Sequence, residues 1–141
     1  MILKKEFTIL IADRNPHVRE FLKREMMKAG YQVRLAANGR EVLKWAYHHE
    51  LVDLIILDSD LPDTDESSLL QKLKDRMPSL PVIIHKFDAG KANFADNFNG
   101  STFVEKSGNS IERLKEVVFD ILRRSDQQQT QIATDRDIYP S

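Results

Sequence analysis

Four charged residues of this sequence stand directly after apolar runs, where a folded chain could use them for chemistry. Asp13 and Asp58 each end one run, and Lys86 and Lys106 end two later ones. Carboxylates and ammonium groups in such positions are candidate ligand-binding or catalytic groups. Each of them alone is typical of a solvated loop. The prediction therefore depends on whether the fold brings them together.

The elements that carry these residues indicate an α/β fold. Short apolar runs alternate with amphipathic stretches, the pattern of a parallel sheet covered by helices on both faces. The sequence predicts a doubly wound parallel sheet of five strands in the order 2-1-3-4-5, with two helices on one face and three on the other. The predicted strands are residues 8–12, 31–36, 54–57, 82–84 and 102–104, and the predicted helices begin near residues 16, 39, 66, 89 and 110.

This fold would place the four charged residues at one edge. In a doubly wound sheet, ligands and catalytic groups gather beyond the carboxyl ends of the strands. The alternative interpretation is a purely structural ion pair between Asp58 and Lys106. No second histidine and no cysteine accompanies His85, so we interpret it as a packed or hydrogen-bonded side chain rather than a metal ligand.

Composition narrows the class of protein. The chain has 141 residues with 41% hydrophobic content, which indicates one domain, and the lack of cysteine excludes disulfides and thiolate metal sites. Lysine plus arginine (21) nearly balances aspartate plus glutamate (22), so we expect no direct nucleic-acid binding. Neither a signal peptide nor an apolar run of about 20 residues is present, so we expect a soluble, cytoplasmic domain without membrane contact.

The end of the chain differs in composition from the rest. From Ser125 onward the sequence is polar and rich in glutamine. Such a segment has little apolar surface to bury on folding. We therefore divide the chain into a domain of residues 1–125 and a polar tail or linker of residues 126–141.

Five motifs in order resemble the receiver domain of two-component response regulators. The motifs lie at residues 9–13 with 15–19, 29–33 with 36–39, 53–58 with 61–62, 81–84, and 103–106, and the resemblance covers residues 8–124. The separations also suit this family: 45 residues from Asp13 to Asp58 and 48 from Asp58 to Lys106. The resemblance implies a flavodoxin-like receiver fold and a part in phosphorelay signal transduction.

The resemblance also implies roles for single residues. Asp58 would accept a phosphoryl group from a histidine kinase or phosphotransfer protein, and Lys106 would pair first with Asp58 and then with the phosphoryl oxygens. Asp13 and Asp58, with the backbone carbonyl of Asp60, would hold magnesium, and Phe103 would be the switch aromatic. The domain would be a signalling module rather than an enzyme, because at most it catalyses its own phosphorylation and dephosphorylation.

Two residues depart from the family pattern. Arg14 stands where a second acidic residue normally follows the first, and Lys86 replaces the hydroxyl residue at the end of the fourth strand. Together with Lys106 they would give the two carboxylates a net charge of +1 before any metal binds. We therefore expect magnesium binding to be weak or absent. We also expect Arg14 or Lys86 to pair with Asp13 or Asp58, and Lys86 to bond a phosphoryl group directly.

Two functions follow from this pattern. The first is a phosphorylatable receiver, and the second is a pseudo-receiver that acts as a phosphorylation-independent protein-interaction module. In both, we expect a downstream protein to bind the face of the fourth helix, the fifth strand and the fifth helix, which a homodimer could also use. Phe94 and Phe98, four residues apart on a weakly patterned helix, motivate this prediction.

Overall fold

A single parallel sheet forms the centre of the molecule. The computed structural model describes the backbone of residues 6–48, 52–76, 80–87 and 101–138, and the side chains of these residues up to Ser125. Five strands lie in the order β2-β1-β3-β4-β5, and all four pairings are parallel. The strands are β1 (Thr8–Ala12), β2 (Gln32–Ala36), β3 (Leu54–Asp58), β4 (Val82–Lys86) and β5 (Thr102–Glu105). The doubly wound topology predicted from the sequence is confirmed.

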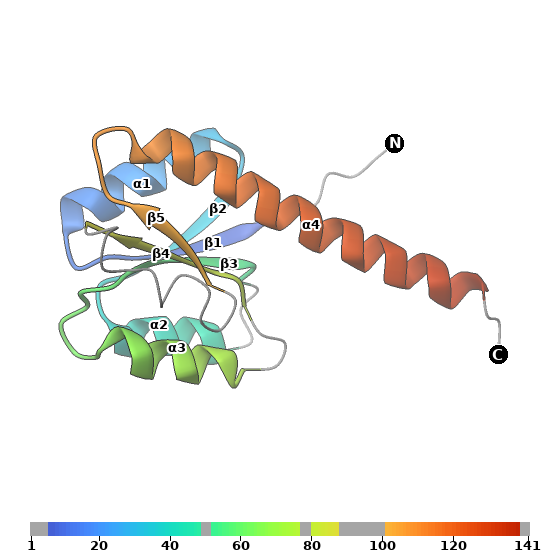
Figure 1. The fold of residues 1–141 in the computed structure, drawn as a ribbon, viewed down its shortest axis with the longest axis horizontal. Coiled ribbons are helices and arrows are strands. Elements are labelled where there is room, and N and C mark those ends of the chain that lie inside the picture. Colours follow the sequence, from blue (N-terminus) through green and yellow to red (C-terminus); the bar gives the residue numbers. More distant parts are fainter. Residues whose placement is uncertain (1–5, 49–51, 77–79, 88–100, 139–141) are drawn as a thin grey trace.

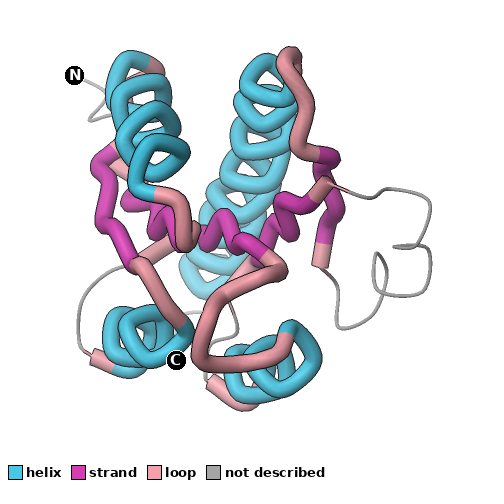
Figure 2. The backbone as a smooth tube through the Cα atoms, turned by 90° about the vertical axis from the view of Figure 1, so that its left-hand side faces the viewer, coloured by secondary structure: helices cyan, strands magenta, loops and turns pink. Residues whose placement is uncertain are grey.

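Helices cover both faces of this sheet. Figures 1 and 2 show α1 (Pro16–Lys28) and α4 (Ser110–Ile138) on one face, and α2 (Gly39–Tyr47) and α3 (Glu66–Lys74) on the other. The helix predicted to begin near residue 89 lies outside the described residues. The predicted arrangement of two helices against three is therefore observed for four of the five.

Local sequence signals fix the helix ends. The side chain of Asn15 accepts a hydrogen bond from the backbone of His17 at 2.9 Å, and Pro16 occupies the first helical position of α1. Gly30 follows α1 with a φ of 100°, a conformation that costs glycine little because it has no Cβ. These signals start α1 at Pro16, three residues after Asp13, and so leave Asp13 at the sheet edge.

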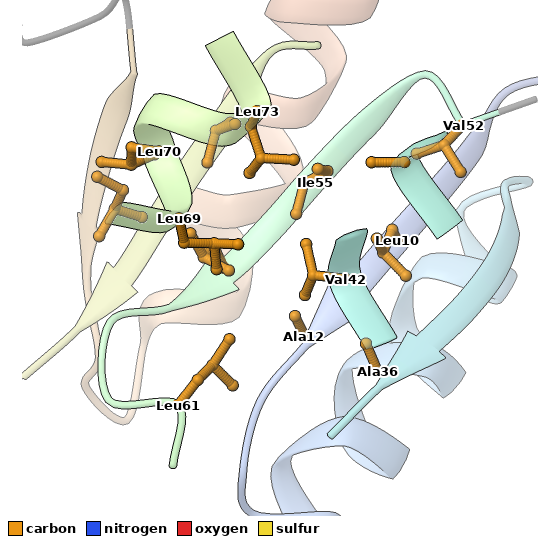
Figure 3. Packing of buried hydrophobic residues seen from close by; sticks show 14 residues of the cluster. Leu10, Ala12, Ala36, Val42, Val52, Ile55, Leu61, Leu69, Leu70 and Leu73 are labelled. Carbon is orange, nitrogen blue, oxygen red and sulfur yellow. The ribbon is translucent and has the colours of Figure 1, made fainter. Parts of the chain in front are cut away.

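The apolar core is divided by the sheet into two clusters. Ile55 and Leu57 of β3 pack toward α2 and α3, whereas Leu54 and Ile56 pack toward α1 and α4. Figure 3 shows the first cluster, in which Val42 of α2 and three leucines of α3 point toward the strands. Because β3 is buried on both faces, its carboxyl end is a rigid platform for Asp58.

The last helix extends well beyond the sheet (Figure 1). We predicted a separate polar tail after residue 125, but the helical backbone of α4 continues to Ile138. The sequence has neither glycine nor proline between Ser110 and Ile138, so no residue there interrupts the helix. The prediction that this segment lacks a core of its own stays a prediction. Within the described residues, no helix combines the length and apolar character needed to span a bilayer.

Candidate functional site

Three buried charged side chains meet at the carboxyl edge of the sheet. Asp13 follows β1, Asp58 ends β3, and Lys106 follows β5, so distant parts of the chain supply them. The ammonium of Lys106 lies 2.9 Å from Oδ2 of Asp13 and 3.3 Å from Oδ1 of Asp58. The side chains are 2%, 1% and 10% exposed for Asp13, Asp58 and Lys106 respectively. We call this group the aspartate–lysine cluster.

Backbone N–H groups complete the environment of both carboxylates. Asn15 donates its backbone N–H to Oδ1 of Asp13 at 2.9 Å. Asp58 accepts from the backbone of Asp60 at 3.1 Å and from that of Arg14 at 3.2 Å. With Lys106 included, each of the four carboxylate oxygens has at least one donor. The buried negative charge is therefore well compensated.

The two carboxyl groups differ in their proton affinity. Burial raises the pKa of Asp13, and the nearby charge of Asp58 adds to this, against the hydrogen bonds from Asn15 and Lys106. Burial also acts to raise the pKa of Asp58, but the backbone N–H groups of Asp60 and Arg14 and the charge of Lys106 outweigh it, so that this pKa is lowered. Asp58 is thus the carboxylate that the fold keeps ionised more firmly.

The predicted pairing of Arg14 with the carboxylates is wrong. Arg14 contributes its backbone N–H to Asp58, but its side chain is exposed and makes no ion pair within the part of the chain that the structure describes. A guanidinium that stays in solvent keeps its hydration, and Lys106 already supplies the buried positive charge. Another arginine does approach, since Nη1 of Arg19 donates to the backbone carbonyl of Asp13 at 2.7 Å.

The predicted pairing of Lys86 with Asp13 or Asp58 is also wrong. Lys86 pairs instead with Glu66, the first residue of α3, at 3.6 Å, and its ammonium lies 5.6 Å from the ring centre of Phe103. Alternation along β4 explains this choice, because His85 contacts Ser110 of α4, and the next side chain therefore points to the opposite face, where α3 lies.

These contacts change the predicted charge of the site. Two carboxylates contact one ammonium in the aspartate–lysine cluster, which gives a net charge of −1 rather than the predicted +1. The Lys86–Glu66 pair is neutral by itself. The electrostatic argument for a surplus of positive charge at the carboxylates therefore does not hold.

Two residues at this edge were not identified from the sequence. Glu66 gave no signal, because an acidic residue in the first turn of a helix is common without any contact. Phe87 follows β4 as an exposed ring, and the ammonium of Lys106 lies 5.2 Å from its centre. From the sequence, the four phenylalanines from position 87 to position 103 are interpreted mostly as core packing, and for Phe87 this interpretation is wrong.

His85 is a packed, hydrogen-bonded side chain, as interpreted from the sequence. It is buried, its Nε2 lies 3.3 Å from the hydroxyl of Ser110, and its Nδ1 has no hydrogen-bond partner in the described ranges of the chain. Burial, together with the positive charge of Lys106, lowers its pKa to about 4, although the charge of Asp58 acts in the other direction. The ring is therefore neutral near pH 7.

Few of the described side chains could bind a metal ion at this edge. Among the described residues, no three histidine or acidic side chains gather in a way that could hold a metal ion. Magnesium commonly uses only one or two carboxylates together with phosphate oxygens and water. Asp13 and Asp58 meet that minimum, but Lys106 already bridges them. Asp60 is exposed and approaches through its backbone N–H.

The remaining predicted residues divide into two groups. Phe103 is partly buried and packs against the core cluster on the side of α2 and α3. Phe94 and Phe98 lie outside the described residues. The structure thus places Asp13, Asp58 and Lys106 in contact, Lys86 with Phe103 and Glu66 beside them, and Arg14 in solvent.

The chain is similar in sequence to known proteins of one family. The family described as the response regulator receiver domain matches residues 9–119. The DNA-binding transcriptional regulator NtrC of Bradyrhizobium sp. (strain RP501 Parasponia) is 38% identical over 77 residues, which cover 55% of this chain and 16% of NtrC. The sensor protein EvgS of Escherichia coli (strain K12) is 38% identical over 81 residues, which cover 57% of this chain and 7% of EvgS. The chain thus spans only a small part of the length of these curated relatives.

A solved structure agrees with this match. The response regulator TrrA of Thermotoga maritima, in complex with Mg(2+)-BeF, is 28% identical with a TM-score of 0.74. The alignment covers 82% of this chain and 98% of that one.

Proposed function

The chain belongs to the response regulator receiver domain family, and from this premise we propose that Asp58 accepts a phosphoryl group from a histidine kinase or a phosphotransfer protein. One observation carries the proposal: Asp58 is a buried carboxylate with a lowered pKa at the end of β3, within 3.3 Å of the ammonium of Lys106. A nucleophilic carboxylate has to be ionised, and the ammonium is in place to stabilise the oxygens of an incoming phosphoryl group.

The transfer makes one bond and breaks another. An oxygen of Asp58 attacks the phosphorus, and a P–O bond forms while the P–N bond to the donor histidine breaks, its electron pair returning to the ring nitrogen. Negative charge develops on the equatorial oxygens of the phosphoryl group. Lys106 stabilises this charge by moving part of its interaction from the carboxylate to these oxygens. All of this chemistry takes place on the domain itself.

Magnesium is part of this proposal as a weakly bound ion. Asp13, Asp58 and the backbone carbonyl of Asp60 would hold it, and it would supply additional positive charge to the phosphoryl oxygens. The low affinity that we predicted now rests on a different cause. Because Lys106 bridges the two carboxylates and every carboxylate oxygen already has a donor, the ion has to compete for its ligands.

Lys86 would contact the phosphoryl group directly. Its neighbour His85 is the register partner of Asp58 in the β3–β4 pairing, so Lys86 stands one residue beyond the phosphoacceptor. The backbone N–H of Lys106 donates to the carbonyl of Lys86 at 2.7 Å, which ties the two lysines to one position at the sheet edge. The ring of Phe103 lies near the Lys86 ammonium. As the switch aromatic, Phe103 would change position when Lys86 moves to the phosphoryl group.

One observation favours the alternative of a pseudo-receiver. Lys106 pairs with both carboxylates, so the resting cluster is stable without a metal ion. In that case the domain would act as a phosphorylation-independent interaction module. In either case we propose that the partner surface includes β5 and α4, for a downstream protein or a second copy of the chain.

Treatment with a small phosphodonor separates the two functions. The protein is incubated with acetyl phosphate, with and without magnesium, and its intact mass is measured. We expect one added phosphoryl group on the wild type and none on Asp58→Ala. An unmodified wild type under both conditions would contradict phosphorylation and favour the pseudo-receiver. Equal modification of Asp58→Ala would show that the acceptor is another residue.

A further inference from the structure

Glu66 is an unusual partner for a lysine at this edge. It begins α3, and its neighbour Asp65 caps the helix by accepting the backbone N–H of Ser68 at 2.7 Å. The carboxylate of Glu66 is mostly buried, with 21% of the side chain exposed. One oxygen lies near Lys86, and the other, Oε1, is buried and has no hydrogen-bond partner among the residues that the structure describes. A carboxylate oxygen in this condition is rare in a stable structure.

The contact between Glu66 and Lys86 is loose. At 3.6 Å the two atoms are further apart than in an ordinary hydrogen bond of about 2.7–3.2 Å, so attraction between the charges holds the pair. The ammonium of Lys86 has the ring of Phe103 as a second weak partner. By contrast, Lys106 lies 2.9 Å from Asp13. Of the two lysines, Lys86 is the one that can leave its partner with little loss.

We propose that Glu66 is a positioning residue that retains Lys86 in the unphosphorylated domain and competes with the phosphoryl group on Asp58 for its ammonium. This inference rests on the proposed function of Asp58. An acyl phosphate carries more negative charge than the carboxylate it replaces, and its oxygens are strong acceptors. Lys86 therefore exchanges Glu66 for the phosphoryl group when Asp58 is modified.

The position of Glu66 at a helix start makes the exchange reversible. The first turn of a helix favours a negative side chain, so Glu66 keeps one stabilising interaction after Lys86 leaves. The released carboxylate turns toward solvent, because without Lys86 its burial is no longer compensated. The first turn of α3 thereby responds to the state of Asp58. Glu66 also lowers the affinity of the site for any phosphoryl-like group, since Lys86 has to be released first.

Binding of beryllium fluoride with magnesium tests this inference without a phosphodonor. Its apparent Kd is measured by titration for the wild type, Glu66→Gln and Lys86→Met, and for the double variant that combines the two substitutions. Glu112→Gln is the control, because it removes an exposed carboxylate from the first turn of α4. Glu66→Gln is expected to tighten binding about two- to fivefold, the range for a partly exposed ion pair. Glu112→Gln is expected to leave it unchanged.

The double variant distinguishes positioning from a general effect of charge. If Glu66 acts through Lys86, Glu66→Gln has no effect on binding in the Lys86→Met background. An equal tightening there, or no tightening in Glu66→Gln alone, would overturn the inference while leaving the proposed function intact. A wild type that does not bind beryllium fluoride would overturn both. Glu66→Ala serves as a second variant, and failure of both Glu66 variants to fold would identify Glu66 as structural and overturn the inference.

Discussion

The aspartate–lysine cluster and the Lys86–Glu66 pair lie at the same edge of the sheet, yet they are built differently. In the cluster, Lys106 contacts two buried carboxylates and backbone N–H groups occupy the remaining oxygens. In the pair, one lysine approaches one carboxylate at a longer distance, and no described residue donates to the second, buried oxygen. The comparison indicates that the cluster is a fixed part of the fold, whereas the pair can rearrange.

The cause lies in the backbone around each group. The loops after β1 and β3 turn their N–H groups toward Asp13 and Asp58, which are therefore solvated by the protein. Glu66 belongs to a helix, and within the described part of the chain its oxygens have no donor other than the ammonium of Lys86. Because hydrogen bonds from fixed backbone groups involve little loss of entropy, the cluster is held more firmly than the pair.

Removal of the central lysine should give the largest difference between the two regions. Lys106→Met leaves two buried carboxylates without a counter-charge, so we expect the free energy of unfolding at pH 7 to fall by about 3–5 kcal/mol. Lys86→Met is the matched control, and it should cost less, about 1 kcal/mol, because Glu66 keeps 21% of its side chain exposed and can turn toward solvent. Urea unfolding of both variants measures this. Similar losses would contradict the distinction between a fixed cluster and a loose pair.

As the pH falls below 6.5, the first loss of folding stability should come from His85, which lies on the face of the sheet covered by α4. Its pKa in the folded protein is about 4, below the ordinary value of 6.5, so the unfolded chain binds a proton more readily. The stability that His85 contributes is complete above pH 6.5 and is lost as the pH falls toward 4, by about 3 kcal/mol at most. We expect His85→Gln to flatten this part of the curve of unfolding free energy against pH.

The control for this prediction is a variant of the Lys86–Glu66 pair. Lys86→Met should keep the slope of the wild type between pH 6.5 and pH 4, because burial, Lys106 and Asp58 set the pKa of His85, and Lys86 points to the other face of the sheet. If His85→Gln and the wild type lose stability in parallel over this range, the buried neutral histidine is not the cause.

Substitution of the two aspartates of the cluster should change the free energy of unfolding in opposite directions. The pKa of Asp13 is raised, chiefly by burial, so its ionised form lowers stability at pH 7, and we expect Asp13→Asn to raise the free energy of unfolding. The pKa of Asp58 is lowered, so Asp58→Asn should reduce it at the same pH. Thermal unfolding at pH 7 measures both effects.

Measuring the unfolding of both variants over a range of pH makes this prediction more specific. The contribution of ionised Asp58 is present above its unfolded pKa near 3.8 and disappears as the pH falls through its lower folded value. The gain from Asp13→Asn should likewise vanish below about pH 3.8, where the wild-type carboxyl group is protonated in both states. Changes of the same sign for both variants at pH 7 would show that the cluster does not separate its carboxyl groups.

Salt should produce the smallest effect, and it should act on the pair. The Debye length falls to about 3 Å at 1 M salt, and salt screens an ion pair more strongly the better solvent reaches it. The side chains of Lys86 and Glu66 are 16% and 21% exposed, against at most 10% in the cluster, so we expect the cost of Lys86→Met to fall at that salt concentration while the larger cost of Lys106→Met persists. Denaturation at low and high sodium chloride provides the measurement. A salt-insensitive cost of Lys86→Met would indicate that packing against Phe103, rather than charge, holds this side chain.

Most of the fold could be predicted from local patterns. The apolar runs placed all five strands, and Asn15, Pro16 and Gly30 marked the two ends of α1. The end of α4 could not be predicted from composition, because a polar segment without glycine or proline is compatible both with a helix and with a linker. The position of Asp13, Asp58 and Lys106 at one edge also followed from strand order alone.

Local sequence signals are enough to identify the residues that reach the carboxyl edge, because strand periodicity and helix caps are local properties of the chain. Which charges meet at that edge depends on tertiary packing. Lys86 and Lys106 both follow strands, but side-chain alternation directs Lys86 toward α3, and Arg14 keeps its hydration in solvent. Pairing depends on competition between solvation and attraction among groups far apart in the chain, and no spacing in the sequence encodes that balance.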